Sequence, residues 1–153
     1  MSRDETLHYV QCGLDYVYLT NGFEVKETPY GRGYRIHAID ELHEAIALDI
    51  TQSNRPIRGQ ELKFLRSMLG LSQEALGHII SKSRAAVARW EGKRADPIDP
   101  TADKLLRAFY LLKKEGCDQA FALIDLFSRI DDLEHGYGQE CFVEKDGLWK
   151  RAA

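Results

Sequence analysis

Cysteine and histidine side chains are the first candidates for metal binding in this chain, and their spacing does not favour it. The three cysteines, Cys12, Cys117 and Cys141, lie far apart and form no CxxC pair, so neither a disulfide framework nor a structural zinc site is expected. His8 and His37 could join Cys12 as ligands in space, but small buried thiols are the simpler expectation. We expect no metal and no other cofactor.

The sequence shows no arrangement of residues that is typical of a catalytic site. The histidines are scattered, and no nucleophile–base spacing or pair of carboxylates stands out. The densest polar cluster is Asp131-Asp132 with Glu134 and His135. It lies at the end of an acidic predicted helix and is typical of a solvated surface. The sequence therefore predicts that the protein is not an enzyme.

Basic side chains are concentrated in one segment of an otherwise acidic chain. The formal net charge is −3, but residues 55–94 hold nine bases and three acids, a net charge of +6. The remainder holds 12 bases and 21 acids, a net charge of −9. This distribution is expected where a single module meets nucleic-acid phosphates. The nine bases are Arg55, Arg58, Lys63, Arg66, Lys82, Arg84, Arg89, Lys93 and Arg94.

Two short helices joined by a tight turn are predicted inside that segment, within LSQEALGHIISKSRAAVARWEGK at residues 71–93. Ser72 and Ser83 are suitable N-caps. The first helix needs a small residue where the second packs against it, and Gly77 meets that need. On the second helix Val87 and Trp90 recur three apart and can anchor it to a core. Its other face is small and basic, as a helix entering the major groove must be; that face comprises Arg84, Ala85, Ala88 and Arg89.

The segment resembles the Xre (lambda-repressor-like) helix-turn-helix family. The LSQE start, Gly77, Val87 and the Arg-Trp-Glu at 89–91 all match its pattern over about twenty residues. The family usually has glycine where this chain has Ser81, at a turn position that tends toward positive φ. A serine adopts that conformation at a modest cost.

The resemblance also implies roles for individual residues. Gln73 is expected to hydrogen-bond a phosphate and to brace the recognition helix. Arg84, Ala85 and Arg89 occupy positions that face base edges, where an arginine reads guanine through O6 and N7 and an alanine touches a thymine methyl. Basic residues beside the helix would bind phosphates and fix the register. The full set expected to contact DNA is Gln73, Lys82, Ser83, Arg84, Ala85, Arg89, Lys93 and Arg94.

The remainder of the chain predicts an α+β fold. Residues 7–37 are β-rich, with turns at Cys12-Gly13 and Asn21-Gly22, the latter as a two-residue hairpin between VYL and FEV. A turn over residues 30–34 leads to a strand at 34–39, and a helix follows from its N-cap Asp40. Five further helices are predicted at 59–69, 72–80, 83–92, 101–115 and 117–133, and a hairpin turning at Asp146-Gly147 ends the chain. Apolar stripes mark a core or a dimer surface on the last two helices; on the helix at 101–115 the stripe comprises Leu105, Leu106, Phe109 and Leu112.

These predictions divide the chain into three segments. Residues 1–54 form a small β-rich interaction domain with one helix, and a polar linker ending at Pro56 marks its boundary. Residues 55–116 form an all-α helix-turn-helix domain of the Xre type. Residues 117–153 form a C-terminal extension of one helix and a short hairpin.

This order of domains also resembles the MqsA-type and HigA-type antitoxin regulators of type II toxin–antitoxin modules. In the MqsA group an N-terminal domain holds zinc through two cysteine pairs and caps a toxin, while the C-terminal domain dimerises and represses. The present chain has only Cys12 in that region, so zinc is not expected. The resemblance implies an autorepressing regulator that binds operator DNA as a homodimer, with a toxin as a possible further partner.

Two alternatives remain open at the level of sequence. One is a stand-alone regulator whose N-terminal domain senses a small molecule or a protein, and the other is an enzyme with a DNA-targeting module. The start of the chain, MSRDETLHYV, has no apolar core of a secretory signal, and no apolar run approaches the roughly 18–20 residues that cross a membrane. We therefore expect a cytoplasmic protein with no membrane partner.

Overall fold

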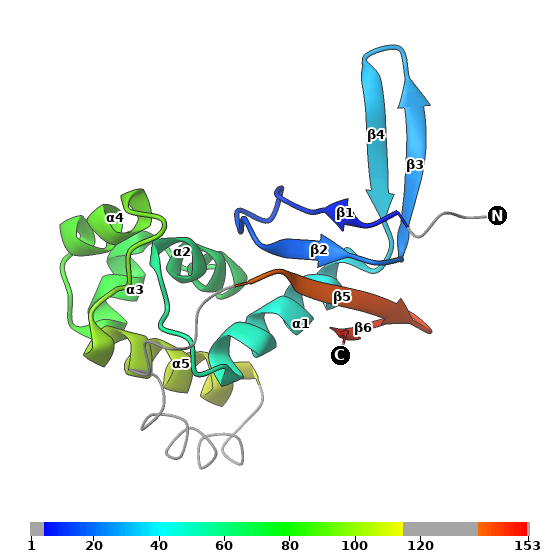
Figure 1. Cartoon of the computed structure of the whole chain (residues 1–153). Coiled ribbons are helices and arrows are strands. Elements are labelled where there is room, and N and C mark those ends of the chain that lie inside the picture. The colour runs from blue at the N-terminus through cyan, green and yellow to red at the C-terminus, as the bar shows by residue number, and fades with distance from the viewer. Residues whose placement is uncertain (1–4, 115–137, 153) are drawn as a thin grey trace. The chain divides into compact units, whose positions relative to one another are not determined.

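The computed structural model describes residues 5–114 and 138–152 and contains both helices and strands, so the predicted mixture of α and β structure is confirmed. The chain divides into two compact units. One, the sheet unit, comprises Met1–Ile46 and Tyr137–Ala153; the other, the helical unit, comprises Ala47–Gly136. Figure 1 labels their elements. The domain boundary predicted at residue 54 lies further along the chain than the observed one between Ile46 and Ala47. The C-terminal hairpin pairs with the N-terminal strands.

The sheet unit is built on four strands from both ends of the sequence. These are β1 (Leu7–His8), β2 (Val17–Leu19), β5 (Glu140–Lys145) and β6 (Leu148–Arg151), in the order β1-β2-β5-β6. β2 pairs with β5 in parallel, and the other neighbours are antiparallel. β5 and β6 form the predicted C-terminal hairpin. Its turn residues Asp146 and Gly147 have φ of 54° and 75°, the left-handed values of a type I′ hairpin turn.

The predicted hairpin at Asn21-Gly22 is wrong, because β2 does not pair with the strand that follows it. Asn21 instead binds the distant strand β5. Its side-chain Nδ2 donates to the carbonyl of Glu144 at 3.2 Å, and its Oδ1 accepts from the backbone N–H of Glu144 at 2.8 Å. The local bend was read correctly from the sequence, but its partner lies more than a hundred residues away.

Strands β3 (Phe23–Thr28) and β4 (Gly31–Ile36) form a separate two-stranded ribbon. Thr28 is paired with Gly31, so the turn consists of Pro29 and Tyr30 and the strand starts earlier than predicted. The predicted turn over 30–34 and strand at 34–39 are therefore wrong in register. Residues of a β-ribbon alternate between its two faces, and the glycines of β4 fit within the strand rather than marking the turn.

Helix α1 (Ile39–Gln52) follows the ribbon. Asp40 lies in its first turn rather than at the predicted N-cap. Leu42 and Ile46 from this helix are fully buried, as are Leu14, Val17 and Leu19. The predicted turn near Gly13 is present, with the Gly13 N–H donating to the Val10 carbonyl at 3.0 Å.

The helical unit contains α2 (Gly59–Met68), α3 (Gln73–Ile80), α4 (Arg84–Gly92) and α5 (Pro100–Lys114). These agree with four of the predicted helices to within one or two residues, and the predicted helix at 117–133 lies outside the described residues. Pro100 begins α5 at a position where its missing N–H costs nothing. The apolar core is completely buried and includes Leu62, Leu65, Leu76, Ile80, Val87 and Leu106.

Helix α5 buries a charged pair that the sequence pattern did not predict. Arg107 is fully buried; its Nε donates to Asp103, and its other nitrogens donate to backbone carbonyls at the end of α1, including that of Ile50 at 3.0 Å. A cation is favourable at a helix C-terminus because unpaired carbonyls gather there. Of the predicted apolar stripe, Leu106 is buried, but Leu105 and Leu112 are exposed.

Within the described residues, every helix is too short or too polar to cross a bilayer.

The sheet unit also contains a partly buried tyrosine–histidine pair, whose rings are stacked. Tyr9 Oη lies 2.8 Å from His43 Nε2. Burial raises the pKa of Tyr9 to about 12, with a further contribution from Cys12. Burial also lowers the pKa of His43, against an opposing effect of Asp40. The tyrosine is therefore protonated and the imidazole neutral at pH 7, so that the two groups share a hydrogen bond between uncharged partners.

The lowered pKa of His43 predicts that the sheet unit loses stability in mild acid. The unfolded chain binds a proton near pH 6.5 while the folded chain resists it, so this contribution is present above that pH and falls as the pH drops below it. The change is expected in urea unfolding followed by Trp149 fluorescence, with Trp90→Phe leaving Trp149 as the sole tryptophan. His43→Gln keeps an acceptor but cannot titrate and should reduce the loss between pH 7 and pH 5. An unchanged loss of stability in that variant would show that His43 is not its cause.

Candidate nucleic-acid interface

Helices α3 and α4 begin at the predicted serine caps. The Oγ of Ser72 accepts from the backbone N–H of Ala75 at 3.0 Å, and the Oγ of Ser83 accepts from that of Ala86 at 3.1 Å. Each bond satisfies one of the N–H groups that a helix leaves unpaired in its first turn. Because α3 ends at Ile80 and α4 begins at Arg84, the turn between them is three residues long.

Ser81 takes the left-handed conformation that the resemblance implied, with φ 57° and ψ 44°. The backbone N–H of Lys82 then donates to the carbonyl of Gly77 at 2.8 Å, which closes the end of α3. Serine thus adopts the left-handed conformation at this position. It adds the strain of a side chain in a region that L-residues rarely occupy.

Two glycines permit close approaches of the backbone. A Cβ on Gly77 would lie 2.5 Å from the carbonyl oxygen of Lys82, so the small residue predicted here is required by the turn rather than by the body of α4. A Cβ on Gly59 would lie 1.9 Å from the carbonyl oxygen of Trp90. The need for Gly59 could not be predicted from the sequence, because this approach joins α2 to the end of α4 and has no local signal.

Glu91 connects three helices and fixes the orientation of α4. Its carboxylate accepts from Arg66 on α2, with Nη2 to Oε2 at 3.1 Å, and from Gln73 Nε2 on α3 at 2.8 Å. Arg66 also donates to the carbonyl of Leu71 at 3.0 Å. The side chains of Arg66 and Glu91 are only 17% and 7% exposed. Gln73 thus braces the second helix, as the resemblance implied, through its bond to Glu91.

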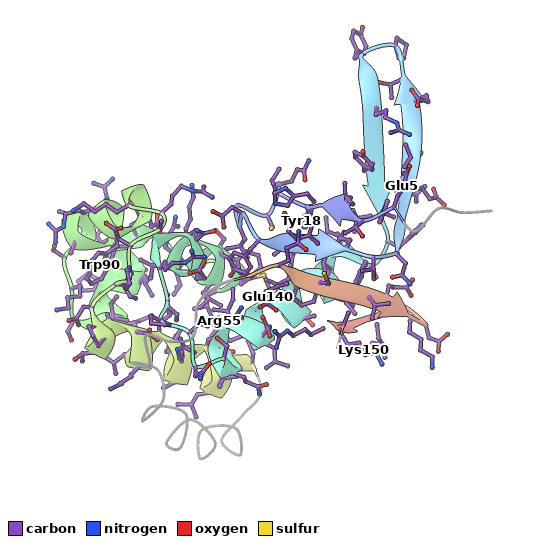
Figure 2. The ribbon with its side chains drawn as sticks, in the orientation of Figure 1. Glu5, Tyr18, Arg55, Trp90, Glu140 and Lys150 are labelled. Carbon is purple, nitrogen blue, oxygen red and sulfur yellow. The ribbon has the colours of Figure 1, made fainter. Side chains whose placement is uncertain are left out.

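The outward face of α4 is small, basic and exposed. Val87 is completely buried, and Trp90, labelled in Figure 2, is half-buried, so the inward side anchors the helix. Within residues 5–114 and 138–152, the side chains of Arg84 and Arg89 make no hydrogen bond or ion pair. Their guanidinium donors are therefore available to another molecule. The exposed residues of this surface are Ser83, Arg84, Ala85, Ala88 and Arg89; together they are called the α4 face below.

The basic segment separates into structural and exposed charges. Arg55, Arg58 and Arg66 form ion pairs within the helical unit, with Asp49, Glu61 and Glu91 respectively. All six side chains are at most 17% exposed. They support the fold and contribute little to the surface potential, a distinction that charge counting could not make.

The remaining charges of residues 55–94 are six exposed bases and one exposed acid, Glu74. The bases predicted to bind phosphate are all in this group, although Lys82 also lies 3.8 Å from Asp99. The exposed basic residues are Lys63, Lys82, Arg84, Arg89, Lys93 and Arg94.

The candidate metal ligands have other partners. His8 Nε2 lies 2.8 Å from the Asp15 carbonyl, its ring stacks on Tyr18, and His37 lies 3.4 Å from Glu24. The Cys12 thiol donates to the Tyr9 carbonyl at 3.4 Å. In the described part of the chain, no three histidine, cysteine or acidic side chains are grouped as metal ligands. Cys117 and the acidic cluster at 131–135 lie outside it.

No protein-family model, curated protein or solved structure matches this chain.

Removing the charge of Glu91 should destabilise the helical unit. Glu91→Gln leaves Arg66 largely buried without a carboxylate, and we expect the free energy of unfolding to fall by about 2–3 kcal/mol. Urea unfolding followed by helical circular dichroism measures the change. Glu74→Gln, which removes an exposed acid from α3, is the matched control and should change it by less than about 0.5 kcal/mol. Equal effects of the two substitutions would show that Glu91 does not brace α4.

The strain at Ser81 predicts opposite effects of two substitutions. Ser81→Gly relieves the left-handed strain and should raise the free energy of unfolding by about 0.5–1 kcal/mol, even after the added flexibility of the unfolded chain. Ser81→Val, which is β-branched, should lower it by about 1–2 kcal/mol. The same urea titration compares them. A glycine variant less stable than the valine variant would contradict the observed turn.

Proposed function

We propose that this protein is a sequence-specific DNA-binding transcriptional regulator that reads the major groove with the α4 face. The carrying observation is that the side chains of Arg84 and Arg89 are exposed and without partners among the described residues, on a helix held by the buried carboxylate of Glu91. The small side chains of Ala85 and Ala88 let the helix backbone approach bases closely. The resemblance to the Xre family agrees with this proposal.

The chemistry of the face assigns roles to its members. Arg89 and Arg84 each carry a planar fork of donors that matches O6 and N7 of guanine. Ala85 offers apolar contact to a thymine methyl. Lys82, Lys93 and Arg94 are exposed next to α4 and would bind phosphates, with Ser83 and Gln73 at the helix starts as further phosphate contacts.

We further propose that the protein binds DNA as a homodimer and represses its own operon. One short helix reads few base pairs, and two half-sites about one helical turn apart supply the usual affinity. The antitoxin resemblance motivates autorepression and a toxin partner for the sheet unit. A regulator that responds to a small molecule is the second candidate, and the cleft described in the next subsection favours it.

A competition between specific and random DNA tests the proposal. A duplex is first selected from a random library by the full-length protein, and its affinity is then measured by fluorescence anisotropy against an unselected duplex at two salt concentrations. Arg89→Ala should weaken specific binding by about ten- to a hundredfold. Arg89→Lys retains the charge, so it should keep the salt dependence and non-specific affinity but lose much of the preference.

Lys63→Ala is the matched control, because it removes one exposed positive charge from α2 instead of α4. It should leave the ratio of specific to non-specific affinity unchanged. If selection enriches no sequence, or if Lys63→Ala reduces that ratio as much as Arg89→Ala does, α4 is not a base-reading helix.

A further inference from the structure

A cleft in the sheet unit is lined by residues from three elements. Its volume is about 370 Å³, and its walls include Leu7 and Tyr9 from β1 and the residues after it, Tyr34 and Ile36 from β4, and Ile39 at the start of α1. Clefts of roughly 300–1,000 Å³ with mostly apolar walls are typical of small-molecule sites. Every lining residue belongs to the sheet unit.

The periodicity of the strands explains why these side chains converge. On β4 the residues Arg32, Tyr34 and Ile36 alternate with others, so they share one face of the ribbon. Tyr34 and Ile39 remain 44% and 42% exposed, and an apolar ligand would cover them. Tyr9 offers only its ring, because its hydroxyl is bonded to His43. The cleft thus suits an apolar body.

Two polar side chains line the same cleft and have donors to spare. Arg32 uses only its Nε, which lies 3.3 Å from Glu27 in a pair whose side chains are 57% and 78% exposed. Exposed pairs of this kind contribute little, so a ligand can replace Glu27. Among the described residues, neither terminal nitrogen of Arg32 nor the side-chain amide of Gln11 makes a hydrogen bond. An arginine fork with spare donors favours a carboxylate or a similar anion.

We propose that this cleft binds a small amphipathic anion, with its apolar body against Leu7, Tyr34, Ile36 and Ile39 and its charged group on Arg32. Gln11 supplies a further donor. The inference concerns the sheet unit and holds whether or not α4 binds DNA. It gives the regulator a site at which a metabolite of this chemistry would act.

The test uses a fluorescent aromatic sulfonate, 8-anilinonaphthalene-1-sulfonate, titrated into the folded full-length protein. Saturable binding is expected, with displacement by octanoate. Arg32→Gln should weaken binding by about tenfold through loss of a charge-assisted contact. Arg35→Gln is the matched control, because Arg35 is an exposed arginine on the opposite face of the same strand and should change affinity less than twofold.

Two further measurements separate the apolar and charged parts of the site. Tyr34→Ala should weaken the sulfonate by removing a wall, while neutral N-phenyl-1-naphthylamine should bind wild type and Arg32→Gln equally. Absence of saturable sulfonate binding, or equal losses in Arg32→Gln and Arg35→Gln, overturns the proposal. Failure of octanoate to displace the probe also overturns the proposal. That result is expected if the cleft accepts only an extended peptide.

Discussion

The candidate DNA-reading surface depends on the shared carboxylate of Glu91. Glu91 lies on the same short helix as Arg84 and Arg89, and its bonds to Arg66 and Gln73 tie that helix to α2 and α3. A nine-residue helix with one completely buried side chain has little apolar area of its own to fix its position. The ion pair supplies the directional constraint, and the close contacts at Gly59 and Gly77 set the spacing. The outward face can then consist of small residues and arginines without loss of rigidity in the helix.

The sheet unit depends on contacts between residues far apart in the sequence, because its strands come from both ends of the chain. β2 needs β5 as its parallel neighbour, and Asn21 needs the backbone of Glu144. Contacts of this sequence separation carry a large loop-closure cost and form slowly. The helical unit, whose caps and turns are local, can form its helices without them. Substitutions in the C-terminal hairpin should therefore affect the sheet whose strand β1 contributes Leu7 to the cleft.

Sequence reasoning predicted the helical unit well because its signals are local. Serine caps and a small residue at 77 each act within a few residues, and the helix bounds followed from them. The positive φ at Ser81 was implied by the family resemblance. The exposed α4 face followed from the same pattern. The basic segment was less informative, since Arg55, Arg58 and Arg66 proved to be structural. Their partners could be identified only once the helices were placed in space.

The failures share a physical cause, which is that they depend on contacts distant in sequence. Asn21-Gly22 has the composition of a hairpin turn, but its hydrogen bonds go to β5. Gly59 is required by a carbonyl on α4, and Arg107 is buried because it satisfies carbonyls at the end of α1. None of these has a pattern in its own neighbourhood. The cleft was missed for the same reason, because its walls come from three separate segments.

Contact between the α4 face and DNA can be observed residue by residue with backbone amide mapping by nuclear magnetic resonance. Isotope-labelled full-length protein would be titrated with the selected duplex, and with an unselected one at low salt. The account predicts that the largest shifts occur at residues 81–89, with smaller shifts at Gln73, Lys93 and Arg94. Unchanged amides at 81–89 together with large shifts elsewhere in the chain would contradict it.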